Sequence, residues 1–327
     1  MKLQQLRYVV EIVRQGNHLS AAAEAVHSSQ PGVSRQIQLL EAELGFEIFV
    51  RTRNRIIGLT EPGKHVLEVA RRVVNDVSSL KSLKEEMSAS DRGTLTVATT
   101  HTLARYILPS AIEGFLTKFP EVQLVLKQGD PEQICEMVDA GDADLAIGTE
   151  TERQFANLVK LSWIDIVRSV VAKKGHPILK VEPLTLRRIA EYPINTYDPR
   201  YSGRRKVLSA FKDAGIEPKI VMSAVDADVS KTYVAMGLGI AIMATVSFDP
   251  VRDTALGARD ASKLFAPSKT YITLRANAYL RPFALQFIRS LAPSLTPNVV
   301  RESLRTAAAR NHAPAAPETP KKKLAAR

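Results

Sequence analysis

Four polar residues spaced as on one face of a helix are the part of this sequence that most directly indicates a chemistry. They are Gln30, Ser34, Arg35 and Gln38. These side chains hydrogen-bond base edges and phosphates and carry no negative charge, as a surface that reads DNA requires. The pattern predicts a helix that offers this face to a nucleic acid, and an ordinary helix with a solvated face is the alternative. The opposite face is apolar at steps of three and four, which favours packing inward: Val33, Ile37, Leu40 and Leu44.

The residues before this helix favour the same interpretation. Ser29 can serve as its N-cap, and Pro31 falls in the first turn, where its missing N–H costs nothing. Residues 19–26 are rich in alanine, whose small side chain lets a second helix cross closely. Two short helices around a tight turn, the second with a polar outer face, are typical of a helix-turn-helix.

A short basic segment follows between two apolar runs. Residues 46–50 and 56–59 read as strands, and Arg51, Arg53 and Arg55 lie between them or at their inner ends. A hairpin tip with three arginines can contact the phosphate backbone beside a recognition helix. A solvated basic turn is the alternative.

The bulk composition fits an anionic partner. The chain has 327 residues and a formal net charge of +11, and much of the excess lies after Val300. The single cysteine, Cys135, excludes an internal disulfide and suits a reducing compartment. We find no signal peptide and no apolar run long enough to span a bilayer, so we expect a cytoplasmic protein without membrane contact.

Residues 61–92 are expected to form a long helix and a hinge. An apolar series runs along the helix with a coiled-coil-like period, which favours pairing of two chains; packing on its own domain is the alternative. The hinge is predicted at residues 88–93, where small and polar residues gather. The apolar series consists of Val66, Ala70, Val73, Val77, Leu80 and Met87.

From residue 93 on, strand-like and helix-like segments alternate, which predicts an α/β domain with mostly parallel sheets. We expect one lobe at about 93–162 and 267–292, and a second at about 163–266. A single helix is expected over 103–120. Residues 293–327, rich in proline, alanine and basic residues, are expected to be a mostly disordered basic tail.

Hydroxyl residues at strand ends and helix starts of this domain suggest an anion site. Thr100 and Thr102 follow one expected strand, Thr149 ends another, and Ser202 opens a helix of the other lobe. Ligands of open α/β sheets bind in this position, although each residue could also be a simple cap. His101 lies in the same turn and could sense the charge of an anion.

Nothing in the sequence indicates catalysis. Cys135 lies within an apolar helical segment, and the histidines lack the spacing of metal ligands. Trp163 is expected to be core rather than a ligand platform. We therefore predict no catalytic residues, no metal and no cofactor.

The first 63 residues resemble the winged helix-turn-helix of LysR-type transcriptional regulators. The resemblance rests on LQQLRYVVEIVRQGN, on LSAAAEAVHSSQPGVSRQIQLLEAELGFEIFVR and on GLTEPGK. It implies a DNA-binding domain at residues 1–60 that binds double-stranded promoter DNA through Ser29, Gln30, Pro31 and the polar and basic residues above. It also implies a linker helix that pairs two chains and a two-lobed α/β effector domain like that of periplasmic binding proteins. A homodimer or homotetramer follows, with RNA polymerase as a further candidate partner.

Within this family, TTHTLARYILP, GDPEQICEMVDAGDADLAIGTE and the YSGRRK region resemble the CysB-like subgroup. That resemblance implies an activator of sulfur-assimilation and cysteine-biosynthesis genes that responds to acetylserine, sulfate or thiosulfate through Thr100, Thr102, Thr149 and Ser202. Leu103 departs from the usual glutamine of the subgroup, and Ser202 replaces a threonine, which leaves the effector open. A sulfonate-utilisation regulator is one alternative; a metabolite-binding protein without gene control is another.

Overall fold

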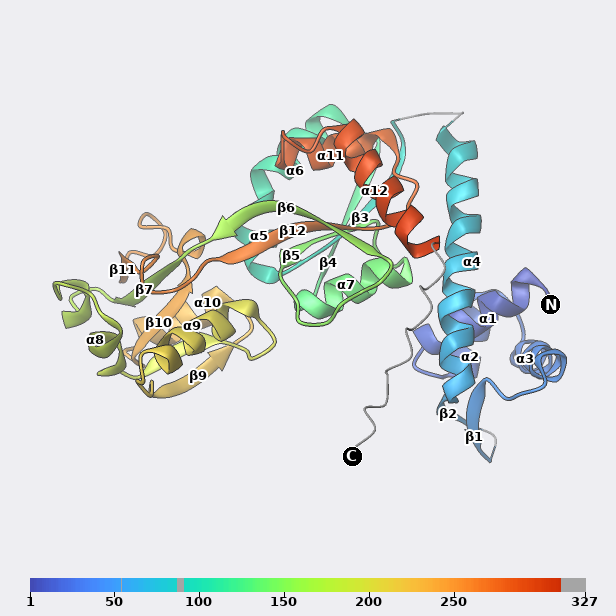
Figure 1. Cartoon of the computed structure of the whole chain (residues 1–327), viewed down its shortest axis with the longest axis horizontal. Coiled ribbons are helices and arrows are strands. Elements are labelled where there is room, and N and C mark those ends of the chain that lie inside the picture. Colours follow the sequence, from blue (N-terminus) through green and yellow to red (C-terminus); the bar gives the residue numbers. More distant parts are fainter. Residues whose placement is uncertain (54, 87–90, 313–327) are drawn as a thin grey trace, which may run out of the picture. The chain divides into compact units, whose positions relative to one another are not determined.

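The computed structural model describes residues 1–53, 55–86 and 91–312, and the chain divides into two compact units, Met1–Arg92 and Gly93–Arg327. Figure 1 colours both units along the sequence. The α/β fold with an N-terminal helix-turn-helix is confirmed. The first unit contains α1 (Leu3–Arg14), α2 (Leu19–Ala25), α3 (Gln30–Leu44), β1 (Phe49–Thr52), β2 (Arg55–Leu59) and α4 (Glu61–Glu86).

The first unit has a core of its own. Three helices and the hairpin close over it, and α1 packs against the start of α4. Ala70 is fully buried and Val66 packs on the same core, whereas Val73 and Leu80 of the predicted series are exposed. One side of α4 therefore packs on the core of its own unit, and a second apolar side of the helix is exposed. Met87 lies outside the described residues.

The second unit has two lobes, each built on a five-stranded sheet. The first sheet has the order β4-β3-β5-β12-β6 and the second the order β11-β7-β10-β8-β9. The first lobe contains β3 (Gly93–Thr99), α5 (His101–Tyr106), α6 (Leu108–Lys118), β4 (Val122–Gln128), α7 (Pro131–Ala140), β5 (Leu145–Thr149), β6 (Leu158–Ile166), β12 (Ser268–Arg275), α11 (Pro282–Leu291) and α12 (Pro297–His312).

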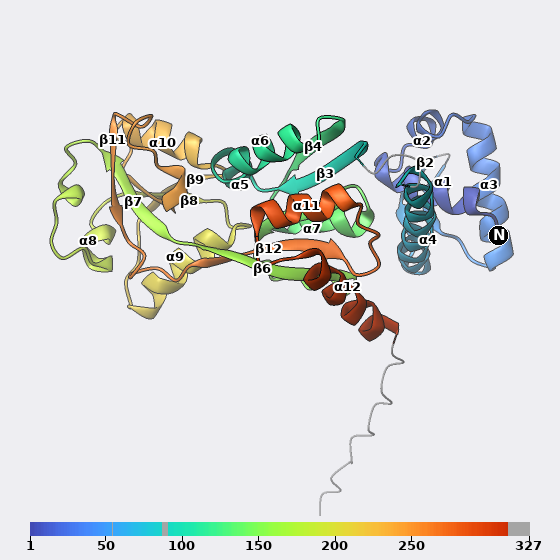
Figure 2. The ribbon, with the colours of Figure 1, turned by 90° about the horizontal axis from the view of Figure 1, so that it is seen from above.

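The second lobe is inserted between β6 and β12. It contains β7 (Arg168–Lys173), η1 (Pro177–Leu179), α8 (Leu186–Ala190), β8 (Ile194–Tyr197), α9 (Ser202–Asp213), β9 (Ile220–Ala224), α10 (Ala227–Ala235), β10 (Ile240–Ala244), η2 (Thr245–Ser247) and β11 (Leu256–Asp260). Figure 2 shows β6 and β12 side by side where the chain leaves the first lobe and returns to it.

The prediction of mostly parallel sheets is wrong. In each lobe two strand pairs are parallel and two are antiparallel: β12 pairs antiparallel with β5 and β6, and β7 does so with β10 and β11. The physical reason is that the chain passes between the lobes twice, once after β6 and once before β12. A strand that enters or leaves a lobe has no crossover helix of its own, so it need not run parallel to its neighbour.

Two helix predictions also need correction. The single helix expected over 103–120 is two helices, α5 and α6, broken at Ile107, because Pro109 has no N–H to continue the α5 hydrogen-bond ladder. Much of the expected disordered tail is helical, since α12 occupies Pro297–His312. Its Val300 and Leu304 are buried in the core of the first lobe, which compensates the cost of ordering the helix. Residues 313–327 lie outside the described part.

Candidate nucleic-acid interface and interlobe cavity

The helix-turn-helix is formed by α2 and α3. Between them the backbone turns tightly at His27, whose φ is +51°. The Ser29 hydroxyl accepts a hydrogen bond from the Gly32 N–H at 3.2 Å, which makes Ser29 the N-cap as the sequence predicts. Val33, Ile37 and Leu40 are buried in the core of the unit. The predicted inward face of α3 is therefore confirmed.

The opposite face of α3 meets solvent. Gln30, Pro31, Arg35 and Gln38 are exposed and Ser34 is half-buried. A rigid helix that presents this polar set, with its apolar side fixed by the core, is able to enter a major groove. Contact of these residues with DNA stays a prediction.

The three arginines of the hairpin have different surroundings. The Arg51 guanidinium donates to the Glu41 carboxylate at 2.8 Å, and Glu41 is almost fully buried in α3. The other oxygen of Glu41 accepts the N–H groups of Ile48 and Phe49. Arg51 thus joins the wing to the recognition helix.

Arg53 and Arg55, by contrast, are exposed. Arg53 forms the tip of the hairpin with φ +56°, and Arg55 begins β2. Neither has a carboxylate partner within the described part of the chain, so both remain free to meet phosphates. Asn54 of the same basic segment lies outside that part.

In the second unit the predicted hydroxyl residues meet at one cavity of about 50 Å³ between the lobes. Thr100 at the start of α5, Thr102, Thr149 at the end of β5, and Ser202 at the start of α9 all line it. Four residues that span a hundred positions in sequence are thereby brought together. The remaining lining residues are Leu103, Ile166, Arg168, Tyr197, Tyr201, Gly203, Ala244 and Ser268.

A chain of polar contacts joins the lobes in the wall of this cavity. The Ser202 and Ser268 hydroxyls lie 2.9 Å apart, and the Arg168 guanidinium donates to Ser268 Oγ at 2.5 Å and to the Ala266 carbonyl at 2.5 Å. Ser202 and Arg168 come from the second lobe and Ser268 from the first. The Ser202 and Ser268 hydroxyls are thus held in place by hydrogen bonds within the protein.

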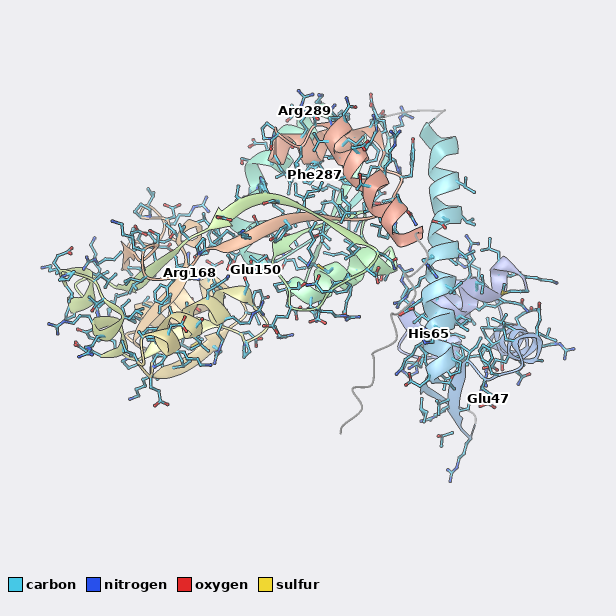
Figure 3. The ribbon with its side chains drawn as sticks, in the orientation of Figure 1. Glu47, His65, Glu150, Arg168, Phe287 and Arg289 are labelled. Carbon is cyan, nitrogen blue, oxygen red and sulfur yellow. The ribbon has the colours of Figure 1, made fainter. Side chains whose placement is uncertain are left out.

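Arg168 is the candidate site residue that the sequence did not indicate. It begins β7, is 2% exposed, and lies at the junction of the lobes with Glu150 (Figure 3). Burial lowers the pKa of its guanidinium, although Tyr197 and Glu150 act in the opposite direction. The group remains a cation at neutral pH. A lone arginine inside the apolar run DIVRSVVA was the available signal.

The two tyrosines of the cavity are neutral donors. Burial raises the pKa of Tyr201 to about 12, and burial also raises the pKa of Tyr197. Gly203 lies against the Tyr197 ring, since a Cβ there would stand 3.1 Å from Tyr197 Cδ2. The close packing of α9 on this ring places Ser202 at the cavity.

His101 is not part of the cavity lining. Its Nδ1 lies 3.0 Å from Gln128 Oε1 at the end of β4, and the cavity wall does not include it. The ring lies instead near Asp226 and Asp228, and the three residues offer ligand atoms within 4.8 Å of one another. Both carboxylates already have partners: Asp226 caps α10 and Asp228 pairs with Arg105.

Ion pairs between the lobes flank the cavity on two sides. On one, Asp228 accepts from the Tyr106 hydroxyl at 2.6 Å and pairs with Arg105 at 2.5 Å. On the other, Arg200 pairs with Asp130 at 3.0 Å. Two further pairs on this side are Arg205 with Glu152 and Lys206 with Glu150. These contacts hold the lobes together around the cavity.

Trp163 and Cys135 have structural roles. Trp163 packs on the core of the first lobe and donates its Nε1–H to the Leu291 carbonyl at 2.9 Å. Cys135 is buried within α7, and burial raises the pKa of its thiol. Both predictions of a structural role are confirmed. Among the described helices, none combines the length and the apolar character needed to cross a bilayer.

Comparison with known proteins gives one family for both units of the chain. Residues 3–64 match the family model of the bacterial regulatory helix-turn-helix protein, lysR family, and residues 88–296 match the LysR substrate binding domain. The HTH-type transcriptional regulator SsuR of Burkholderia cenocepacia is 45% identical over 94% of this chain and 100% of its own length. The regulator CysB of the same organism is 44% identical over 93% of this chain and 97% of its own.

A solved structure of a regulator domain matches the fold of the second unit. The cofactor-binding domain of the Cbl transcriptional regulator superposes with a TM-score of 0.62 at 35% identity, and covers 65% of this chain and 93% of that domain. These relatives are transcriptional regulators and not enzymes. The chain belongs to the LysR family of bacterial transcriptional regulators, in the subgroup of SsuR, CysB and Cbl.

Proposed function

We propose that this LysR-type regulator controls genes of sulfur assimilation and that a small anion in the interlobe cavity switches it. The observation that carries the proposal is the convergence of four hydroxyl residues and a buried guanidinium on one cavity. Hydroxyl donors and a fixed positive charge among largely buried side chains are suited to an oxyanion or carboxylate. Acetylserine, sulfate and thiosulfate are the effectors to test first.

On the DNA side, α3 would read bases in the major groove while Arg53 and Arg55 contact the backbone. The exposed polar face of α3 supports this assignment, as do the exposed arginines of the wing. We expect the protein to act in the cytoplasm, where promoter DNA lies. If it activates transcription, RNA polymerase is the expected further partner.

Self-association would bring two readers to adjacent half-sites. LysR-type regulators oligomerise, and this chain leaves apolar side chains exposed in places suited to a second copy. Val73 and Leu80 are exposed on α4, and Val229 and Tyr233 of α10 are exposed together with Met236 at the C-cap of that helix. A homodimer or homotetramer would cover these surfaces.

The switch would act through the lobes. A ligand that contacts Thr100 and Thr149 from one lobe and Ser202 from the other binds best at one lobe separation, so it shifts the population toward that state. The flanking ion pairs, such as Asp228 with Arg105, set the equilibrium that the ligand must shift. The linker helix would transmit the change to the DNA-binding domain.

Promoter binding by the full chain, followed by fluorescence anisotropy with and without each candidate anion, tests this function. Arg35→Ala should weaken specific binding at least about tenfold, whereas Arg289→Ala, on the exposed side of α11, should not (Figure 3). Thr100→Val should remove the response to the anion and leave DNA binding in its absence intact. Normal binding by the Arg35 variant would contradict the reading helix, and a normal response by the Thr100 variant would contradict the cavity.

A second candidate, a regulator of sulfonate utilisation, is favoured by one observation. Leu103 lines the cavity with an aliphatic side chain at the position where the subgroup commonly has glutamine. An amide there would donate a hydrogen bond to an oxyanion, and leucine cannot. The difference points to a ligand with an apolar part on that side.

A further inference from the structure

We infer that the cavity selects a monoanion with a short aliphatic group, a short-chain alkanesulfonate, and that Leu103 and Ile166 discriminate against inorganic sulfate. The inference rests on the proposed anion site and names its ligand class. Three features of the cavity carry it: its charge, its wall and the number of its hydroxyl groups.

The first feature is a single positive charge. Of the described residues that line the cavity, Arg168 alone is charged, and it is 2% exposed. Glu150 lies beyond the lining, where its charge acts on Arg168, but it is also paired with Lys206 at 3.4 Å, so the three groups together carry one positive charge. A monoanion neutralises Arg168, whereas a dianion such as sulfate leaves an uncompensated charge out of water, which is unfavourable.

The second feature is an aliphatic wall. Leu103, Ile166 and Ala244 are at most 7% exposed and line the same cavity as the hydroxyls. None of their side chains can hydrogen-bond an oxygen. A fourth sulfate oxygen placed against them loses its hydration without compensation, while an alkyl carbon there gains about fourfold in affinity for each buried CH₂ group.

The third feature is the number of hydroxyl donors. Thr100, Thr102, Thr149 and Ser202 surround the cavity, in addition to the guanidinium. A carboxylate presents two oxygens to such a set, and a sulfonate presents three. The sulfonate therefore satisfies more of these donors with the same single charge.

The size of the cavity limits the chain length. At about 50 Å³ it is matched in size by a small head group with a short substituent. Ethanesulfonate is consequently the probe that matches the charge, the oxygen count and the size together.

Titration calorimetry on the full-length protein tests the inference with ethanesulfonate, sulfate and propionate at one pH and one ionic strength. We expect ethanesulfonate to bind at least about tenfold more tightly than either of the others. Leu103→Gln should weaken ethanesulfonate binding by about tenfold and strengthen sulfate binding, because the amide replaces aliphatic wall with a donor. Val251→Gln, at a position 82% exposed in the second lobe, is the control and should leave both affinities unchanged.

Ile166→Thr serves as a second variant at another point of the aliphatic wall, because both side chains also belong to the core of the first lobe and one variant alone could act through stability. It should move the preference toward sulfate as well. Sulfate binding as tight as ethanesulfonate to the unmodified protein would overturn the inference and leave the anion cavity standing. Failure of all three anions to bind would overturn the cavity too. A preference unchanged in both variants would overturn the role of the aliphatic wall.

Discussion

Glu41 of the recognition helix and Arg51 of the wing form a 2.8 Å ion pair in which the carboxylate is almost fully buried. The same carboxylate also accepts two backbone N–H groups, of Ile48 and Phe49, at the start of the hairpin. The angle between the reading helix and the wing is therefore fixed by one acidic side chain. An acidic residue is unexpected on a helix that approaches phosphates, and its burial explains how it is tolerated.

Replacing this carboxylate should loosen the wing. Glu41→Gln keeps an acceptor but removes the charge that holds Arg51, and we expect a loss of about 2 kcal/mol of unfolding free energy in the first unit. DNA affinity should fall with it. Urea denaturation gives the first quantity and anisotropy the second. Glu47→Gln, at an exposed glutamate of the same segment (Figure 3), is the matched control. Equal stability of the two variants would contradict the role assigned to Glu41.

The exposed wing arginines should affect the salt dependence of binding. Removing Arg53 or Arg55 should decrease the slope of log K against log salt by about 0.9 for each phosphate that the variant no longer neutralises. Arg51→Ala should lower stability instead, because its guanidinium is held by Glu41. The slope is measured from anisotropy titrations over a range of salt concentrations. Slopes unchanged in both tip variants would place the phosphate-binding groups elsewhere.

The uncovered side of α4 should mediate pairing of chains. Leu80 is 65% exposed, and Leu80→Glu would put a charge into an apolar seam, which should weaken self-association by roughly tenfold or more. Sedimentation velocity over a concentration series measures the effect. Val251→Glu adds the same charge at an exposed position of the second unit and serves as control. Unchanged association of the Leu80 variant would move the interface away from α4.

His176 should make the second lobe less stable in mild acid. Burial lowers the pKa of its imidazole below the ordinary value, while its Nδ1 accepts the Ile178 N–H at 3.2 Å as the N-cap of η1. As the pH falls below about 6.5, the unfolded chain binds a proton that the folded lobe binds less readily. Stability contributed by His176 is thus complete above that pH and decreases toward its lowered folded pKa.

The measurement is a series of thermal unfolding curves from about pH 7.5 to about pH 5.5. His176→Asn keeps an N-cap acceptor and removes the titrating ring, so the midpoint of this variant should change less with pH than that of the unmodified protein. Parallel pH profiles for the two proteins would show that another group is responsible.

The position and the buried side of the helix α3 could be predicted from residues that are close together in the sequence. The three-and-four spacing of Val33, Ile37 and Leu40 predicted the buried side of α3, and Ser29 predicted its cap. The hydroxyls at Thr100, Thr102, Thr149 and Ser202 were placed at one cavity because strand ends and helix starts meet at the same edge of α/β sheets. For α3 the local pattern was enough, whereas for the four hydroxyls the resemblance to the CysB-like subgroup was also needed to favour a ligand site over simple caps.

Contacts between distant segments could not be predicted in the same way. Arg168 reaches Ser268 across 100 positions, and nothing near it in sequence shows that partner. Glu41 reads as an exposed residue of a helix until the hairpin folds back onto it. The antiparallel strands depend on where the chain crosses between lobes, which is a property of topology. The burial of α12 likewise depends on a face of the first lobe that the helix itself does not encode.

The two crossings between the lobes pass directly through the wall of the cavity. Val167 separates Ile166 of the first lobe from Arg168 of the second, and Ser268 follows the return segment. Three residues that would contact the proposed ligand, Ile166, Arg168 and Ser268, therefore lie where the lobes would rotate. The proposed ligand would act at this pivot, so a displacement of a fraction of an ångström there would become larger at the far end of each lobe, in proportion to the length of the lobe.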